Sequence, residues 1–251
     1  MTKTERGRIR VGVGGWTFAP WRGVFYPDGL AQRLELTHAA SKLSSIEING
    51  TYYGSQKPES FAKWHDETPA DFVFSLKGPR FTTNRRVLAE AGESIGRFFA
   101  SGVMELKDKL GPVNWQFATT KKFDPADMAA FLALLPTEIG GRAIRHALEV
   151  RNASFAVPEF HDLARKHGVA IIRAGDSEYP EIAAATAGFA YLRIMGTQAD
   201  EAEGYDAAGL KRWAGEAEGL AKSGQDVFLY VISGAKERNP AAAMALIERL
   251  G

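Results

Sequence analysis

The sequence predicts an α/β fold, a single (β/α)8 TIM barrel formed by residues 1–251 as one domain. Three observations support this prediction: eight short apolar runs, a helix-length segment between successive runs, and a chain length that suits one such barrel. An open doubly wound sheet is the main alternative, because the number of strands is difficult to derive from one sequence.

Each predicted strand is short, rich in apolar residues and mostly bounded by Gly, Pro, Asn or Asp. The eight runs are residues 9–13, 45–48, 72–76, 113–117, 146–150, 169–173, 189–194 and 227–232. Their alternation with helical segments continues along the whole chain, which is the order of elements in a barrel.

Capping residues mark several of the helices. Asp124 and Asn239 each precede a proline, so each is predicted to cap a helix that has proline at its first position. Asp206 is predicted to begin a helix with an apolar stripe, and Gly224 to end it.

The composition excludes several classes of site and of protein. The chain has 31 basic and 30 acidic residues, and its net charge of +1 does not indicate a nucleic-acid or membrane partner. It has no cysteine, which excludes disulfides, thiolate nucleophiles and iron–sulfur clusters. The charged start lacks the apolar region of a signal peptide, and no apolar run approaches the roughly 18 residues of a membrane span. We therefore expect a cytoplasmic protein.

Polar residues occur near the C-terminal ends of five predicted strands, on the face opposite the apolar one. They are Glu47, Lys77, Gln116, Glu149 and Arg193. In a barrel these side chains would converge at the C-terminal mouth, where barrel enzymes keep their active sites. A structural ion-pair network is the alternative for any single residue, since buried charges must be paired. The same pattern on five strands favours a ligand site.

These residue types indicate anion binding and proton transfer. Lys77, Arg151 and Arg193 suit a phosphate or carboxylate group, and Arg80 is a further cation. Glu47 and Glu149 could form an acid/base pair. Lys77 could alternatively form a Schiff base if burial removes its proton. Trp16 and Tyr52 could stack on a sugar or a base.

The sequence predicts no metal site and identifies no cofactor. Four histidines fall in helical patterns, and His146 begins its strand, at the opposite end of the barrel from the mouth. A magnesium or manganese site formed by Glu47, Glu149 and Asp176 stays open as an alternative.

A series of motifs then points to a family. They are Gly14-Gly15-Trp16, residues 21–27 (WRGVFYP), 47–53 (EINGTYY), 77–81 (KGPRF) and 110–112 (LGP), Gln116, and residues 149–151 (EVR) and 191–193 (YLR). Together they resemble the bacterial family called domain of unknown function 72, or YecE-like, over nearly the whole chain. The resemblance implies a TIM barrel with a pocket at its C-terminal mouth, and no established reaction.

Carried over to this sequence, the family resemblance implies ten pocket residues. They are Trp16, Glu47, Asn49, Tyr52, Lys77, Arg80, Gln116, Glu149, Arg151 and Arg193. The chain departs from the family pattern at residues 117–122 (FATTKK) and at Met195, where relatives usually have Leu-Pro-Pro-Ser and His. Specificity could differ on those sides of the pocket.

Three functions are compatible with these observations, because fold alone does not choose among them. The first is an enzyme acting on a small anionic ligand, such as a phosphorylated sugar or a nucleotide-like compound. The second is a nucleic-acid-binding or nucleic-acid-processing barrel whose backbone contacts would be Arg80, Arg85, Arg86, Lys121 and Lys122. The third is a non-catalytic ligand-binding module. The oligomeric state stays open.

Overall fold

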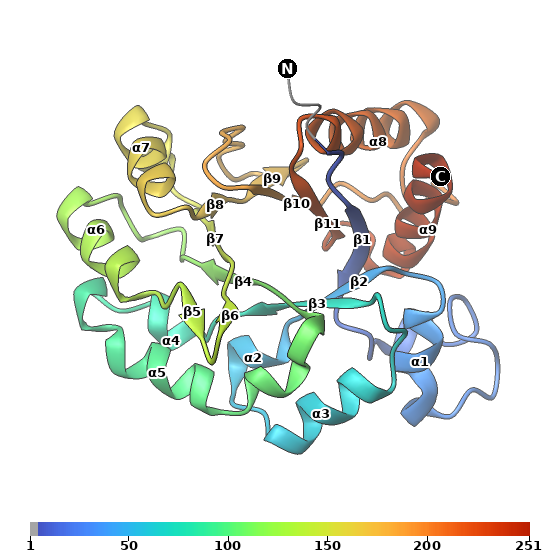
Figure 1. Ribbon diagram of the computed structural model, residues 1–251. Coiled ribbons are helices and arrows are strands. Elements are labelled where there is room, and N and C mark those ends of the chain that lie inside the picture. The colour runs from blue at the N-terminus through green and yellow to red at the C-terminus, as the bar shows by residue number, and fades with distance from the viewer. Residues whose placement is uncertain (1–4) are drawn as a thin grey trace.

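Parallel strands form the inner layer and helices the outer layer of the computed structural model, which describes residues 5–251 (Figure 1). The strands are β1 (Ile9–Gly14), β2 (Ser45–Ile48), β3 (Val73–Lys77), β4 (Leu110–Gln116), β5 (Glu138–Ile139), β6 (Arg142–Ala143), β7 (His146–Glu149), β8 (Ala170–Ile171), β9 (Arg173–Gly175), β10 (Phe189–Ile194) and β11 (Asp226–Val231). The helices are α1 (Glu35–Ala40), α2 (Gly50–Tyr53), α3 (Pro58–Asp66), α4 (Arg80–Thr83), α5 (Gly92–Ala100), α6 (Pro125–Leu134), α7 (Pro158–Lys166), α8 (Ala207–Lys222) and α9 (Asn239–Leu250). The predicted α/β barrel is confirmed.

The strands of the barrel pair in parallel in the order β8-β7-β4-β3-β2-β1-β11-β10-β9. The two end strands, β8 and β9, are consecutive in the chain with only Ile172 between them. β8 lies within the predicted run of residues 169–173, and β9 begins at the last residue of that run. Because the two ends of the strand order are joined by one residue, the ring of strands is nearly closed. The antiparallel hairpin of β5 and β6 was not predicted, because its strands are two residues long and not buried.

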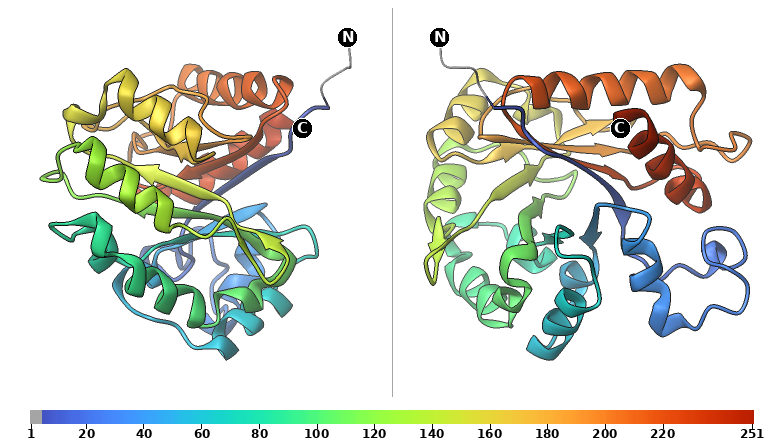
Figure 2. Two further views of the ribbon diagram at one scale, coloured as in Figure 1. Left: turned by 60° about the vertical axis from the view of Figure 1, so that its left-hand side comes forward. Right: turned by 45° about the vertical axis from the view of Figure 1, so that its right-hand side comes forward.

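The strand direction gives the barrel two different ends. In the right-hand view of Figure 2 the strand arrows point to the side at which the loops after β1 and β10 project. This side is the C-terminal mouth, where the last residues of every parallel strand meet. The β5–β6 hairpin lies at the opposite end.

Alternation along the strands separates two cores. Outward-facing residues such as Val11, Ile46 and Phe74 pack with the helices in one large cluster. Inward-facing residues form a second cluster inside the barrel: Val73, Ala147, Ala170, Ile172, Phe189, Tyr191, Phe228 and Tyr230. The period of two therefore assigns each strand residue to the helix layer or to the barrel interior.

Two of the three predicted N-caps are confirmed. The Asp124 carboxylate accepts from the Asp127 amide at 3.0 Å, and the Asp206 carboxylate accepts from the Gly209 amide at 2.7 Å. The prediction for Asn239 is wrong, because Asn239 is already the first residue of α9. Its Oδ1 atom accepts from the Thr197 hydroxyl at 2.8 Å, which ties the loop after β10 to α9.

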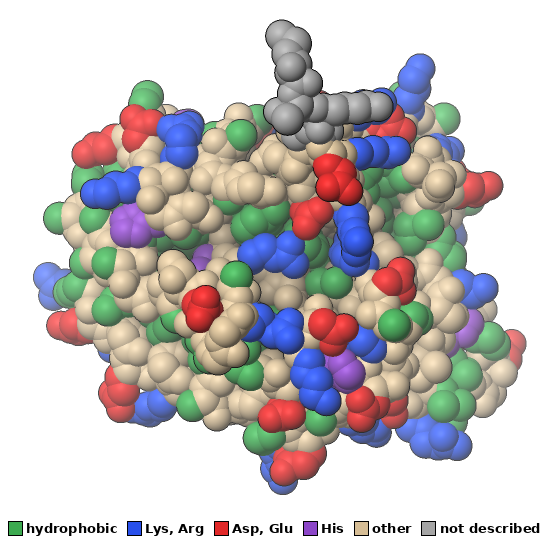
Figure 3. All heavy atoms as spheres, in the orientation of Figure 1, with side chains coloured by type: hydrophobic (Ala, Val, Ile, Leu, Met, Phe, Trp, Pro, Cys, Tyr) green, Lys and Arg blue, Asp and Glu red, His purple; other side chains and the backbone are tan. Residues whose placement is uncertain are grey.

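Charge is mixed on one face of the molecule (Figure 3). On the face seen in Figure 3, basic and acidic side chains are interspersed and no broad area carries one sign. No helix within residues 5–251 is long and apolar enough to cross a membrane.

Candidate functional site

The structure brings five of the predicted site residues together inside the C-terminal mouth. Glu47, Lys77, Gln116, Glu149 and Arg193 end β2, β3, β4, β7 and β10 or lie one residue before the end. The register places Gln116 beside Glu149, and Asn114 of β4 beside Lys77. We call these residues, together with Asn114 and Arg151, the mouth cluster.

Arg193 bridges the two carboxylates of the mouth cluster. Its Nη2 atom donates to Glu47 Oε1 at 3.0 Å, and its Nη1 atom donates to Glu149 Oε2. The Arg193 side chain is 2% exposed and both carboxylates are 0% exposed. Burial alone would lower the pKa of Arg193, but Glu149 and Glu47 outweigh it and raise that pKa above its usual range. The guanidinium group therefore stays charged.

Arg151 holds the other oxygen of Glu149. Its Nε and Nη2 atoms donate to Glu149 Oε1 at 2.8 and 2.6 Å. Burial would raise the pKa of Glu149, but the positive charges of Arg193 and Arg151 outweigh it and hold that pKa below its usual range. Glu149 is thus a carboxylate at neutral pH and has no proton to donate.

Glu47 is held by neutral groups as well as by Arg193. The Tyr191 hydroxyl donates to Glu47 Oε2 at 2.5 Å, and Asn114 Nδ2 donates to the same oxygen at 3.1 Å. Burial and the neighbouring Glu47 raise the pKa of Tyr191 well above its usual value, so its hydroxyl remains a donor.

Lys77 is the cation of the mouth cluster without a carboxylate partner. Its Nζ atom donates to Gln116 Oε1 at 2.6 Å and lies 4.2 Å from the centre of the Tyr52 ring. Across residues 5–251 it forms no ion pair within 4 Å. Burial and the nearby Arg193 lower the pKa of Lys77 from 10.5 to about 8, although Glu47 and Glu149 oppose this shift. Lys77 can therefore exchange a proton near neutral pH.

Two further polar atoms of the mouth cluster are buried without a hydrogen bond. Asn114 Oδ1 and Arg193 Nε have no partner among the described residues. Unpaired buried polar atoms are uncommon because each lost hydrogen bond costs about 1–3 kcal/mol. The structural ion-pair network accounts for the paired atoms, and it leaves these two atoms and Lys77 unexplained.

The remaining predicted residues lie around the mouth cluster. The Tyr52 hydroxyl accepts from Gln116 Nε2 at 3.3 Å, and the Tyr52 ring meets the edge of Tyr53 at 5.1 Å. Arg80 is exposed and lies 5.8 Å from the Tyr53 ring, so it belongs to the rim.

Trp16 and Asn49 line a hollow of about 320 Å³ beside the mouth cluster. Its other walls are Gly14, Gly15, Thr17, Ile48, Gly50, Gln56, Trp64 and Lys236. These residues end β1 and β2 or follow β1, β2 and β11, so the hollow opens at the C-terminal end of the barrel.

Sequence reasoning did not assign four residues that contribute to this region. Asn114 and Tyr191 hold Glu47, Tyr179 accepts from Arg151 Nη1 at 3.2 Å, and Lys236 lines the hollow. Asn114 and Tyr191 share the inward face with Gln116 and Arg193, so strand alternation could have identified them. Tyr179 lies in an irregular segment after β9, and Lys236 begins a three-residue 3-10 helix after β11, so periodicity gives no signal for either residue.

Of the three residues considered for a metal site, Glu47 and Glu149 share Arg193, and Asp176 is bound by other residues. Asp176 accepts from Trp213 Nε1 at 2.7 Å and from Arg212, so its carboxylate points to α8. Within the described part of the chain, no group of three or more His, Asp or Glu side chains is arranged to hold a metal ion.

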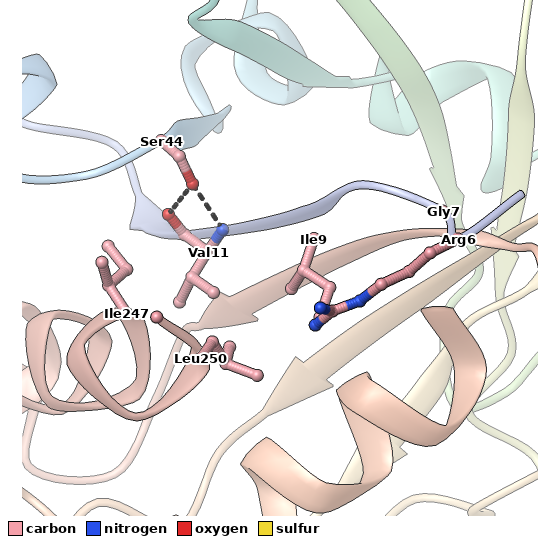
Figure 4. A pocket seen from close by; sticks show the side chains of 8 residues that line it. Arg6, Gly7, Ile9, Val11, Ser44, Ile247 and Leu250 are labelled. Carbon is pink, nitrogen blue, oxygen red and sulfur yellow. Dashed lines mark hydrogen bonds between the residues drawn. The ribbon is translucent and has the colours of Figure 1, made fainter. Parts of the chain in front are cut away.

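A different hollow, of about 250 Å³, lies beside the N-terminal part of β1 (Figure 4). Ile9, Val11 and Leu250 give it apolar walls, and Arg6 reaches over it. Ser44 fixes the strand here, because its Oγ atom accepts from the Val11 amide at 2.8 Å. None of the predicted site residues lines this hollow.

Comparison with known proteins establishes the family. Residues 10–251 match the family model described as "Protein of unknown function DUF72". The chain belongs to the DUF72 family. This confirms the family that the sequence motifs indicated.

Curated DUF72 relatives resemble part of the chain. The UPF0759 protein YecE of Escherichia coli strain K12 is 26% identical over 150 residues, which cover 59% of this chain and 50% of that protein. The UPF0759 protein YunF of Bacillus subtilis strain 168 is 27% identical over 160 residues, 61% of this chain and 54% of that protein. The chain thus spans about half the length of the curated relatives it matches.

Solved DUF72 structures have the same fold. A DUF72 family protein from Thermotoga maritima superposes with a TM-score of 0.78 at 21% identity, over 97% of this chain and 98% of that chain. A DUF72 family protein from Enterococcus faecalis superposes with a TM-score of 0.76 at 18% identity, over 96% of this chain and 95% of that chain. A xylose isomerase-like TIM barrel/4-hydroxyphenylpyruvate dioxygenase fusion protein superposes with a TM-score of 0.56 at 14% identity, over 97% of this chain and 43% of that chain. At these identities the likeness concerns the fold alone.

Proposed function

We propose that this DUF72 protein is an enzyme that binds a small phosphorylated ligand, a sugar phosphate or a nucleotide-like compound, at the C-terminal mouth of its barrel. One observation carries the proposal: the mouth cluster contains three cations and two carboxylates, and Lys77 has no carboxylate partner among the described residues. A buried cation without a partner destabilises the protein. An anionic ligand would supply the missing charge.

The ligand would meet the exposed side of the mouth cluster. Lys77 and Gln116 are 6% and 7% exposed, and the Arg151 side chain is 20% exposed, whereas Glu47 and Glu149 are fully buried. Lys77 and Arg151 are thus the cations that a ligand reaches first. Lysine and arginine are the residue types that hold phosphate groups in proteins.

Lys77 is also the group best suited to proton transfer. Its pKa of about 8 lies near neutral pH, so both of its protonation states are accessible. Glu149 is held ionised by Arg193 and Arg151, so it can accept a proton and cannot supply one. In this proposal Lys77 gives or takes the proton, and Glu47 and Glu149 position Arg193 and Arg151.

Ligand-induced thermal stabilisation tests the proposal. Wild type and Lys77→Met are heated with inorganic phosphate, sugar phosphates and nucleotides, with Lys42→Met as an exposed control. A ligand at about 100 times its Kd stabilises by roughly 2.7 kcal/mol. We expect stabilisation of wild type and of Lys42→Met, and its loss in Lys77→Met. Stabilisation retained in Lys77→Met would contradict the proposal. Binding without turnover under all conditions would instead favour a non-catalytic module.

Nucleic-acid binding is a second candidate because of exposed aromatic and basic side chains after β2 and β3. Tyr53 and Phe81 are 70% and 50% exposed, Arg80 lies 5.8 Å from the Tyr53 ring, and Arg86 is exposed further along the segment after β3. Lys121 does not join this row, since its Nζ atom bonds the Arg86 carbonyl at 2.9 Å and Asp127 at 3.0 Å. Contacts to several phosphates would make the affinity for single-stranded DNA or RNA fall steeply with salt. A salt-independent affinity would exclude this candidate.

A further inference from the structure

The hollow beside the mouth cluster has a position that suits a second part of the ligand. It is built mainly by residues that follow β1 and β2. In the strand order β3-β2-β1-β11, Lys77 ends β3 on one side of it, and Lys236 follows β11 on the other. Its volume of about 320 Å³ lies at the lower end of the range of small-molecule sites.

The hollow lies beside the end of β3, which Lys77 forms. Ile48 lines the hollow and pairs with Leu76, and Asn49 and Lys77 are the residues that follow these two in the chain. The Thr51 hydroxyl donates to the Lys77 carbonyl at 2.7 Å, which fixes the start of α2 against the end of β3. A ligand held at Lys77 can therefore extend into the hollow.

The walls of the hollow offer neutral hydrogen-bonding groups. Asn49 and Gln56 line it with side-chain amides, each of which can donate and accept. Neither side-chain amide forms a hydrogen bond with another described residue, whereas the amides of Gln116 and Asn114 in the mouth cluster are both bonded. None of the described residues that line the hollow carries a carboxylate. This combination fits hydroxyl groups, which also both donate and accept, and does not favour a cation.

The aromatic walls favour a saturated ligand over a flat base. Trp16 and Trp64 meet edge to face, with ring centres 5.1 Å apart and an angle of 78° between planes. They form no parallel slot in which a base could stack between two rings. An indole wall of this kind packs well against the C–H groups of a sugar.

Lys236 gives the hollow a cation at its far side. Its backbone is fixed because Trp21 Nε1 donates to the Lys236 carbonyl at 2.8 Å, and its Nζ atom lies 4.2 Å from the centre of the Phe18 ring. It forms no ion pair within the part of the chain that the structure describes. Its ammonium group is available to an oxygen of the ligand.

We infer that this hollow binds the hydroxylated carbon skeleton of a sugar phosphate whose phosphate group is held at Lys77 and Arg151. The inference rests on the proposed function and narrows its ligand to the sugar phosphates. Asn49 and Gln56 hydrogen-bond the hydroxyl groups, Trp16 packs against the carbon skeleton, and Lys236 binds an oxygen at the end far from the phosphate.

Two ligands with the same anionic group separate the hollow from the mouth cluster. The affinities of ethyl phosphate and ribose 5-phosphate are measured by calorimetry at pH 7.5 for wild type, Gln56→Ala and Lys236→Met. Gln198→Ala is the matched control, an exposed glutamine at the same end of the barrel, after β10. We expect wild type and Gln198→Ala to bind ribose 5-phosphate about tenfold or more tightly than ethyl phosphate.

Gln56→Ala and Lys236→Met should each reduce this preference to about threefold or less and leave the affinity for ethyl phosphate within about twofold of wild type. Equal affinity of wild type for both ligands, or an unchanged preference in both variants, would overturn the inference alone. Absence of binding of either phosphate to wild type would overturn the proposed function and this inference with it.

Discussion

The two halves of the barrel interior solve the problem of buried polar groups in different ways. In the N-terminal half the buried polar side chains around Tyr230 are neutral and bonded to each other, and the cation Arg145 below them pairs with Asp226. In the C-terminal half they are charged, and some of their atoms have no partner among the described residues. An interior whose polar groups are hydrogen-bonded to each other needs no ligand to satisfy them. An interior with charged groups and unbonded polar atoms is suited to binding a ligand.

Tyr230 is the centre of the N-terminal half. Its hydroxyl is 2.7 Å from Ser45 Oγ and 2.7 Å from Ser75 Oγ, and Ser45 Oγ donates to the Val73 carbonyl at 2.6 Å. Burial raises the pKa of Tyr230 above its usual range, so the group is neutral. Apolar side chains such as Phe228 surround this small network. It provides hydrogen bonds without introducing charge.

The C-terminal half instead concentrates charge. Glu47, Glu149 and Arg193 are almost fully buried, and Arg193 connects the two carboxylates by ion pairs. Asn114 Nδ2 also donates to both carboxylates, at 3.1 and 3.4 Å. Tyr191 joins the halves, because its ring packs among the apolar residues and its hydroxyl donates to Glu47. Among the described residues, Lys77 has no carboxylate partner beside this network. A cation without an ion pair therefore lies at the mouth.

Arg193→Met should cause the largest change in the free energy of unfolding. It leaves two buried carboxylates without their shared partner, and breaking a buried pair typically costs about 3–5 kcal/mol. Chemical denaturation at pH 7 measures the free energy of unfolding. Arg165→Met is the control, since Arg165 pairs with Asp162 on the surface and should lose less than about 1 kcal/mol. Equal small losses in both variants would show that the mouth network does not stabilise the fold.

Lys77→Met should act in the opposite direction and stabilise the protein. Lys77 has a pKa of about 8 in the folded protein and 10.5 unfolded, so between these values the unfolded state binds more protons. Stability of wild type therefore rises as the pH increases from about 8 to about 10.5, and the penalty is fully present below pH 8.

We expect Lys77→Met to raise the free energy of unfolding by about 2 kcal/mol at pH 7, after allowance for the lost hydrogen bond to Gln116. Denaturation at pH 7 and at pH 10 should show this advantage shrinking at the higher pH. If Lys77→Met is less stable than wild type at pH 7, Lys77 stabilises the folded protein, as the groups around Tyr230 do.

Tyr230→Phe should have the smallest effect. It removes the hydroxyl shared by Ser45 and Ser75 and should cost about 1 kcal/mol in the free energy of unfolding. Because this group lies in the N-terminal half, phosphate binding should be unchanged. A loss of phosphate affinity comparable with that of Lys77→Met would remove the functional distinction between the halves.

The sequence predicts most of the fold because apolar periodicity is a local property. All eight runs coincide with strands, and the inward position of Glu47 or Arg193 follows from alternation along one strand. The break of the sixth strand at Ile172 and the β5–β6 hairpin depend on how neighbouring segments pair. The Asn239 prediction is wrong for a similar reason. Its side chain accepts a hydrogen bond from Thr197, which lies on a distant loop and which the local sequence does not reveal.

The chemistry of the candidate site is less accessible to sequence reasoning. Glu149 and Lys77 both belong to the expected set, yet only their three-dimensional neighbours distinguish a carboxylate held ionised from an amine with a lowered pKa. The hollow between Trp16 and Lys236 forms from segments more than 200 residues apart, and no short motif describes it.

The pH dependence of ribose 5-phosphate binding tests the central claim most directly. Above pH 7 the phosphate group is a dianion and the raised pKa of Tyr52 keeps that phenol neutral, so Lys77 is the titrating member of the mouth cluster. Wild-type affinity should fall by about tenfold per pH unit above pH 8, and this fall should persist in Lys236→Met. In Lys77→Met the affinity should be weak and independent of pH. A constant wild-type affinity from pH 7 to 10, or undiminished binding by Lys77→Met, would contradict the claim that Lys77 awaits an anion.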